Sequence, residues 1–199
     1  QREALLQGIQ VEIAHTSEHW PGGLIDNAWR GRVSDVCVLG LSPDSAEPRL
    51  YVEDWLFGAG RPCILYPDSS KQKFSADNVL ICWDFSRSAA RTVSDALPFL
   101  HNAKRVHVAV FRGEKDIPIA DPTTPLIAFL KAHGIAVEAK DVVIGKRTIG
   151  QAILEHAETT GVNLILMGAF GHSRLREFLL GGATRELLAK STIPILMSH

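Results

Sequence analysis

The chain has 199 residues, of which 46% are hydrophobic and 22% charged, so it is long enough to bury one large core or two small ones. Its formal net charge of -1 argues against a general nucleic-acid-binding protein, because such proteins are usually basic. No apolar run of about 18 residues and no signal peptide is visible, so the sequence predicts no membrane association and a cytoplasmic location.

Helical and strand-like patterns alternate along the chain. Helices are expected at 1–7, 24–32, 50–57, 86–102, 122–133, 148–160 and 184–191. Strands are expected at 9–14, 36–39, 62–66, 78–83, 105–111, 135–143, 164–167 and 193–197. A polar segment at 67–77 resembles a linker. The alternation predicts an α/β fold with an open, doubly wound parallel sheet of Rossmann-like or flavodoxin-like type.

Cysteine and histidine spacing gives no metal-binding pattern. Cys37, Cys63 and Cys82 each lie in an apolar, strand-like run, which predicts buried free thiols and suits a reducing cytoplasm. His15 and His19 could bind a metal ion if they shared one helix, but their segment is more typical of a strand running into a loop. Surface histidines are therefore expected there, and no metal site is predicted.

A glycine-rich stretch follows the expected strand at 164–167. Gly168 and Gly171 come first, Gly181 and Gly182 follow, and a helical pattern resumes at Thr184. Glycines between a strand and a helix let the backbone approach an anion, and the N–H groups of the helix favour negative charge. The alternative is a set of ordinary tight turns that happen to contain glycine. We take the first interpretation, which predicts a nucleotide or phosphate pocket.

The chain also contains an internal repeat. GIQVE at Gly8 matches GIAVE at Gly134, VCVLG ending at Gly40 matches LILMG ending at Gly168, and RPCILYP matches IPILM. The first copy has no counterpart of 78–111 and none of the phosphate-type glycines. Two related units are therefore expected, and the alternative is one irregular domain with coincidental matches.

The glycine spacing resembles that of the universal stress protein family. Nucleotide-binding members carry Gly, two residues, Gly, nine residues, Gly and then Ser or Thr, and Gly168, Gly171 and Gly181 fall on the three glycines. Gly182 stands where the family has the hydroxyl residue. The resemblance implies a tandem member with sheets like those of adenine nucleotide alpha hydrolases. It divides the chain into the back half of a degenerate first domain at 1–68, a linker at 69–76 and a complete domain at 77–199.

The resemblance also implies partners and ligands. In this family the last strands of two domains pair. The strand at 62–66 is therefore expected to pair with the strand at 193–197 of the same chain, or the equivalent strands are expected to pair between two chains of a homodimer. The expected ligand is ATP or AMP, with Mg²⁺ as a candidate counter-ion. Its binding residues would be Asp84 for ribose or adenine, Phe111 beside adenine, and a phosphate-binding set of Gly168, Gly171, Arg174, Gly181, Gly182, Ala183 and Thr184.

Each of these side chains also has a structural interpretation. Asp84 could instead brace the helix that follows it, Phe111 could be a core aromatic, and Arg174 could lie on a solvated face. The function that we expect is a stress-response protein that signals through nucleotide occupancy to an unidentified protein partner. The alternatives are an interaction module that binds no nucleotide and a weak ATPase or self-phosphorylating protein with Ser173 and Thr184 as candidate hydroxyls. His172 and Ser173 are neighbours in sequence with no carboxylate placed to orient the histidine, so no catalytic residue is predicted. The absence of the P-loop pattern argues against vigorous NTP hydrolysis.

Overall fold

The computed structural model describes residues 10, 23–42, 48–70, 73–113, 121–169 and 182–199. The helices are η1 (Gly23–Val33, a 3-10 helix), α2 (Pro48–Ala59), α3 (Arg87–Asp95), α4 (Leu97–Leu100), α5 (Thr124–Ala132), α6 (Ile149–Thr160) and α7 (Gly182–Lys190). The strands are β1 (Cys37–Leu41), β2 (Cys63–Pro67), β3 (Asn78–Cys82), β4 (Arg105–Arg112), β5 (Glu138–Val143), β6 (Leu164–Gly168) and β7 (Ile195–Ser198).

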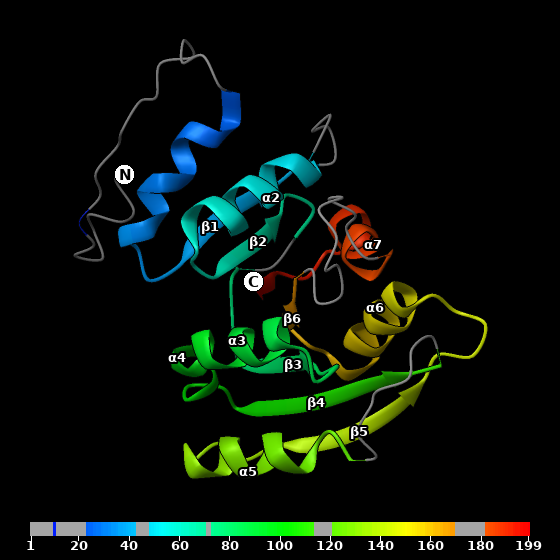
Figure 1. Cartoon of the computed structure of the whole chain (residues 1–199). Coiled ribbons are helices and arrows are strands. Elements are labelled where there is room, and N and C mark those ends of the chain that lie inside the picture. Colours follow the sequence, from blue (N-terminus) through cyan, green and yellow to red (C-terminus); the bar gives the residue numbers. More distant parts are fainter. Residues whose placement is uncertain (1–9, 11–22, 43–47, 71–72, 114–120, 170–181) are drawn as a thin grey trace.

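These seven strands form one sheet in the order β1-β2-β7-β6-β3-β4-β5 (Figure 1). Neighbouring strands are parallel except β2 and β7, which pair antiparallel with Cys63 opposite Met197 and Leu65 opposite Ile195. The predicted α/β class with a mostly parallel sheet is confirmed. The predicted pairing of the two final strands is also present, and it lies within one chain.

Helices cover both faces of the sheet, and each face has its own apolar core. Alternate strand residues such as Leu65 and Ile165 belong to the core that includes side chains of α2, α6 and α7. Their neighbours Ile64 and Leu166 belong to the core that includes side chains of α3, α4 and α5. Because β6 is covered on both faces, its sequence is apolar throughout instead of alternating.

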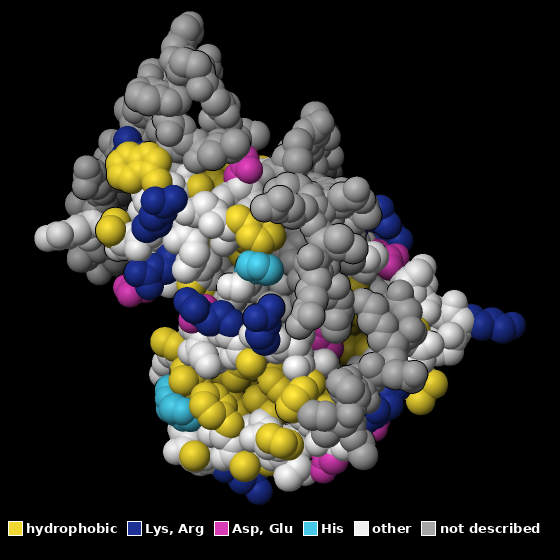
Figure 2. Space-filling view, in the orientation of Figure 1, with side chains coloured by type: hydrophobic (Ala, Val, Ile, Leu, Met, Phe, Trp, Pro, Cys, Tyr) yellow, Lys and Arg dark blue, Asp and Glu magenta, His cyan; other side chains and the backbone are white. Residues whose placement is uncertain are grey.

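Hydrophobic side chains also reach the surface over α3 to α5, in the lower half of Figure 2. Among the large ones, Phe85 is 39% exposed and Phe129 is 38% exposed. Single exposed apolar residues are common on proteins, so this surface by itself implies no partner.

The single helix expected at 86–102 is wrong, since the structure has α3 and α4 there, with Ala96 between them. Pro98 explains the difference, because it has no N–H group to donate to the carbonyl of residue 94 and so interrupts the helical ladder. The strand expected from residue 135 starts only at Glu138. The elements expected at 1–7 and 9–14 lie outside the described residues, apart from Gln10.

The cysteines are free, as predicted, and Cys37 and Cys63 are buried while Cys82 is partly buried. Burial raises the pKa of the Cys63 thiol to about 12, so the thiol stays protonated and unreactive at neutral pH. Within the described ranges, no helix is both long enough and apolar enough to cross a membrane.

Candidate functional site

The strand order reverses between β3 and β6. From β3 the chain adds β4 and β5 on one side and then returns to place β6 on the other side of β3. In open α/β sheets, the crevice at the carboxyl ends of two such strands is where ligands bind. Cys82 pairs with Met167 across these strands, so the next residues, Trp83 and Gly168, lie level at this crevice.

Asp84 lies in the loop between β3 and α3, and its side chain is exposed. Its Oδ1 accepts a hydrogen bond from the Ser86 N–H at 3.0 Å, and the Ser86 hydroxyl caps α3 by accepting from the Ala89 N–H at 3.1 Å. Between them, Phe85 has a φ of 60°, which is uncommon for a residue other than glycine. Strained backbone of this kind is frequent at binding sites. Asp84 therefore shapes the start of α3 and is exposed at the crevice.

Trp83 connects this loop to α5. Its indole Nε1 donates to the Pro122 carbonyl at 2.6 Å, and its side chain is buried in the core beneath α3 and α5. Sequence patterns could not pair these two residues, because the hydrogen bond joins positions far apart in the chain. The bond fixes the carboxyl end of β3, from which Asp84 projects.

Gly168 ends β6 against the first turn of α3. A Cβ atom at this position would lie 2.4 Å from the Ala89 backbone nitrogen and 2.6 Å from the Ser88 hydroxyl oxygen. Separations below about 3.0 Å do not occur for real Cβ atoms, so only glycine fits here. The sequence assigned this glycine to an approaching anion, but packing of α3 already requires it.

A buried hydroxyl holds α3 in this position, and sequence reasoning missed it. Thr92 is 1% exposed. Its hydroxyl donates to the Ser88 carbonyl at 2.8 Å and is also directed toward the Met167 carbonyl at 3.2 Å. The same oxygen accepts from the Ser198 N–H at 3.1 Å. The only sequence signal was a polar residue on the inner face of an expected helix. This contact joins α3 to β6 and β7 beside the crevice.

Helix α7 begins at Gly182, on the far side of the glycine-rich stretch. A Cβ atom at Gly182 would meet no atom of the described residues within 4 Å. Ala183 is partly buried, and Thr184 is only 4% exposed. Gly182 is therefore exposed at the start of α7, whereas the Thr184 side chain packs into the protein.

Helix α6 fixes the position of α7 through Glu186. The Thr148 hydroxyl donates to one carboxylate oxygen of Glu186, and Lys190 Nζ lies 2.8 Å from the other. These two hydrogen bonds, Lys190 first, lower the pKa of Glu186. Gly150 makes the close approach possible, since a Cβ there would lie 2.6 Å from a Glu186 oxygen.

Phe111 lies near the carboxyl end of β4, and its ring is half-buried. It packs against the core beneath α6, with its ring edge-on to His156 at 6.0 Å between ring centroids and 85° between ring planes. This placement agrees with the core interpretation of the side chain. The residue still lies at the carboxyl edge of the sheet, where its backbone groups are near the crevice.

Protonation of His156 is expected to make the fold less stable in mild acid. Burial, followed by the nearby Lys140 and His107, lowers the pKa of His156 below its ordinary 6.5. Above that pH the imidazole is neutral in both states and contributes nothing. As the pH falls below 6.5, the unfolded chain takes up a proton that the folded chain resists, so the free energy of unfolding decreases. Urea denaturation between about pH 5 and 7.5 should show the free energy of unfolding decreasing as the pH falls.

The matched variant is His156→Gln, which removes the titrating group and should flatten this slope. An unchanged pH dependence in the variant would contradict the assignment to His156.

The remaining predicted site residues, Gly171, Arg174 and Gly181, lie outside the described residues, as does Ser173. The structure thus brings together Asp84 and Gly168 at one crevice and places Gly182 at the start of the helix that follows β6. It assigns a packing role to Gly168 and to Thr184.

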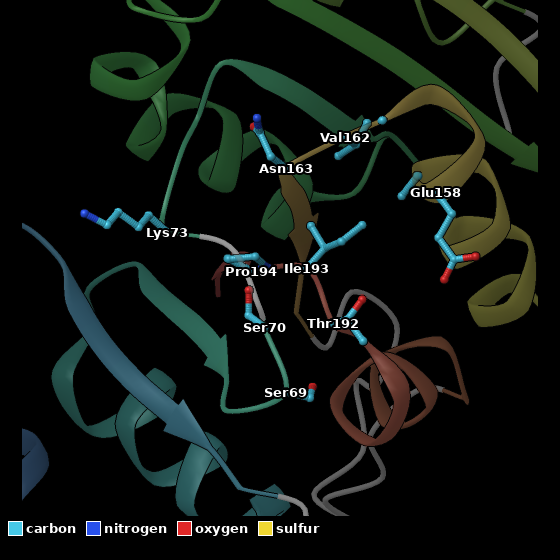
Figure 3. A pocket seen from close by; sticks show the side chains of 11 residues that line it. Ser69, Ser70, Lys73, Glu158, Val162, Asn163, Thr192, Ile193 and Pro194 are labelled. Carbon is cyan, nitrogen blue, oxygen red and sulfur yellow. The ribbon is translucent and has the colours of Figure 1, made fainter.

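A hollow of about 380 Å³ lies at the amino ends of β6 and β7, opposite the carboxyl ends of the strands (Figure 3). It is bordered by the residues before β6 and β7, the end of α6, and the segment after β2. Lys73 and Glu158 lie on opposite sides of it and do not point toward one another. Among the described residues that line it, no charged groups converge, and it is separate from the carboxyl ends of β3 and β6.

Comparison with known proteins identifies the family. Over residues 76–199 the chain matches the model of the universal stress protein family. It is 30% identical over 143 residues to universal stress protein Slr1230 of Synechocystis, covering 68% of this chain and 46% of that protein. It is 33% identical over 66 residues to universal stress protein MJ0577 of Methanocaldococcus jannaschii, covering 32% of this chain and 38% of that protein. The chain spans less than half the length of these curated relatives.

Solved structures show the same fold. A universal stress protein from Archaeoglobus fulgidus superimposes with a TM-score of 0.72 at 19% identity, covering 98% of this chain and 73% of that one. The structure of MJ0577 superimposes with a TM-score of 0.51 at 24% identity, covering 60% of this chain and 93% of that one. Because the family model matches more than half of the sequence, the chain belongs to the universal stress protein family.

Proposed function

We propose that this protein binds an adenine nucleotide, ATP or AMP, at the carboxyl ends of β3 and β6, and that it signals by occupancy in a cytoplasmic stress response. The observation that carries the proposal is the reversal of strand order between β3 and β6, with exposed Asp84 beside Gly168. The complete domain at 77–199 would hold the nucleotide.

Apart from the Asp84 carboxylate, the charges in the first turns of α3 and α7 favour an anion. Neither α3 nor α7 has an acidic residue in its first turn, where a carboxylate would normally complement the helix dipole. Both carry an exposed arginine there instead, Arg87 in α3 and Arg185 in α7. A bound phosphate group would relieve both unfavourable arrangements.

The predicted residues then have distinct roles. Asp84 would accept hydrogen bonds from ribose hydroxyls, and the backbone near Phe111 would contact adenine. Backbone N–H groups of Gly171, Gly181 and Gly182 would bind phosphate oxygens, with Arg174 as a charged partner and Mg²⁺ as a counter-ion. Gly182 has no hydroxyl to offer, so the phosphates would depend on backbone donors.

Replacing Asp84 by Asn tests the ribose contact. The amide oxygen can still accept from the Ser86 N–H, so the start of α3 should be preserved, but a charged acceptor for two hydroxyls is lost. A hydrogen bond to a charged group contributes about 1.5–3 kcal/mol, so ATP affinity is expected to fall about 10- to 100-fold in titration calorimetry. Equal affinity in a variant of unchanged thermal stability would exclude Asp84 from the site.

The second candidate is an interaction module of the same fold that binds no nucleotide. Gly182 favours it, because the family hydroxyl is missing. Nucleotide released on denaturing the purified protein, and identified by chromatography, would exclude this alternative.

A further inference from the structure

The helix η1 presents two of its three sides to solvent. In a 3-10 helix, side chains three residues apart lie in one row, because each turn has three residues. The row of Ala28 and Gly31 is buried and packs against α2, where a Cβ atom at Gly58 would lie 2.7 Å from the Ala28 Cβ. The other two rows are exposed and consist of Trp29 with Arg32 and of Arg30 with Val33.

The exposed rows place large apolar side chains beside positive charge. Trp29 is 52% exposed and Val33 is 91% exposed. The Arg30 guanidinium lies over the Trp29 ring, with 5.3 Å between its central carbon and the ring centroid. This cation–π contact keeps the charge next to the indole. Trp and Arg are among the residue types that contribute most to the binding energy of protein interfaces.

Arg61 adds a further positive charge at the end of η1. Its Nε and Nη2 donate to the Arg32 carbonyl at 3.1 and 2.9 Å, and the Arg32 Nε donates to the Gly58 carbonyl at 2.9 Å. These bonds satisfy carbonyls at the carboxyl ends of η1 and α2, which is a common structural role of arginine. That role does not use the other guanidinium nitrogens. Within the described ranges, no carboxylate pairs with Arg30, Arg32 or Arg61.

Positive charge therefore outweighs negative charge on this surface. Residues 28–35 together with Arg61 hold three arginines and one acidic residue, Asp35. Figure 2 shows Lys and Arg side chains beside hydrophobic side chains over η1, at the upper left. The planar guanidinium group matches a carboxylate with two parallel hydrogen bonds. The surface is thus complementary to carboxylates that lie beside an apolar side chain.

We propose that Trp29, Arg30, Arg32, Val33 and Arg61, which we call the η1 surface, bind an acidic peptide segment of a partner protein. Carboxylates of the segment bind the arginines, and an apolar side chain of the segment packs on the indole. The proposal goes beyond nucleotide binding, because none of these residues lies at the carboxyl ends of β3 and β6. It is therefore tested without nucleotide.

Two other occupants fit the surface less well. A second copy of the chain would bring carboxylates that are already engaged, since Asp77, Asp95, Asp141 and Glu155 each pair with a Lys or Arg. Duplex DNA is a long polyanion that requires an extended basic surface, whereas the whole chain has a formal net charge of -1.

The first test titrates the purified chain into a fluorescein-labelled peptide of about 12 residues, rich in Asp and Glu around one central Phe, and follows anisotropy. Saturable binding is expected with a Kd of about 10 to 100 μM at about 50 mM salt, weakened at least about threefold at about 200 mM salt. A companion peptide with Asn and Gln in place of Asp and Glu should bind at least about tenfold more weakly. Equal binding of the two peptides would overturn the proposal.

Arg30→Glu locates the binding on the η1 surface. Arg30 contacts the Trp29 ring and has no hydrogen-bond partner among the described residues, so its replacement should leave Tm unchanged. The Kd for the acidic peptide is expected to rise at least about tenfold. Trp29→Ser keeps the charge and should raise the Kd about fivefold through loss of the apolar contact.

The matched control is Arg105→Glu, which makes the same charge change at an exposed residue at the start of β4. This variant should alter the Kd by less than about twofold, because its charge is screened from a peptide bound at η1. Equal weakening by Arg30→Glu and Arg105→Glu would show attraction to the protein as a whole and would overturn the proposal. Tighter binding of duplex DNA than of the peptide, lost in Arg30→Glu, would assign the surface to nucleic acid and would overturn it as well.

Discussion

Replacing Gly168 by alanine is expected to destabilise the fold by about 3 kcal/mol, a large effect for one methyl group. The new Cβ would lie 2.4 Å from the Ala89 backbone nitrogen, so the first turn of α3 would have to move away from β6. Thr92 joins that helix to Met167 and Ser198 by hydrogen bonds, so the shift would strain those contacts as well. Thermal unfolding should show Tm lowered by about 6 to 12 °C.

The control is Gly40→Ala at the equivalent place in β1, where the nearest atom of the described residues to the new methyl group would be Asp68 Oδ1, at 3.8 Å. This variant is expected to change Tm by less than about 2 °C, because a surface substitution without a clash is close to neutral. If both variants unfolded at the same temperature, the close approach of α3 to Gly168 would not be the reason for that glycine.

Replacing Gly182 by serine is expected to tighten ATP binding about 10-fold. A Cβ at this position meets no atom of the described residues within 4 Å, and the hydroxyl would restore a donor that the family pattern contains. One added hydrogen bond to a charged phosphate oxygen contributes about 1.5 kcal/mol at the low end of its range, which corresponds to about a tenfold change in Kd. Titration calorimetry of the two proteins measures it.

Gly182→Ala separates the hydroxyl from the helix. Alanine and serine both favour α7 over glycine, but only serine adds a donor. An alanine variant that gained as much affinity as the serine variant would show that helix order, not phosphate contact, limits binding.

Much of the fold could be predicted because its central strands β3 and β6 are buried on both faces. The apolar runs of β3 and β6 are continuous. The resemblance to the family predicted that β2 and β7 would pair. Pro98 was visible in the sequence, but apolar periodicity across it suggested one helix. That error shows that the missing N–H group of proline outweighs the pattern.

The candidate site could be predicted in part. Asp84 and Gly168 were found because they follow expected strands, and register across β3 and β6 brings them to one crevice. The packing role of Gly168 was missed, since the contact with Ala89 joins segments about eighty residues apart and leaves no local signal. The hydrogen bond from Trp83 to the Pro122 carbonyl was also missed, because it too joins residues far apart in the chain.

Nucleotide binding itself is tested most directly by titration calorimetry of the purified, nucleotide-stripped protein with ATP and AMP in the presence of Mg²⁺. The proposal predicts saturable binding with a Kd near 1 μM, equivalent to about -8 kcal/mol. It also predicts a rise in Tm at saturating nucleotide. No heat of binding together with no thermal shift would contradict it, and would leave an interaction module built on the same sheet.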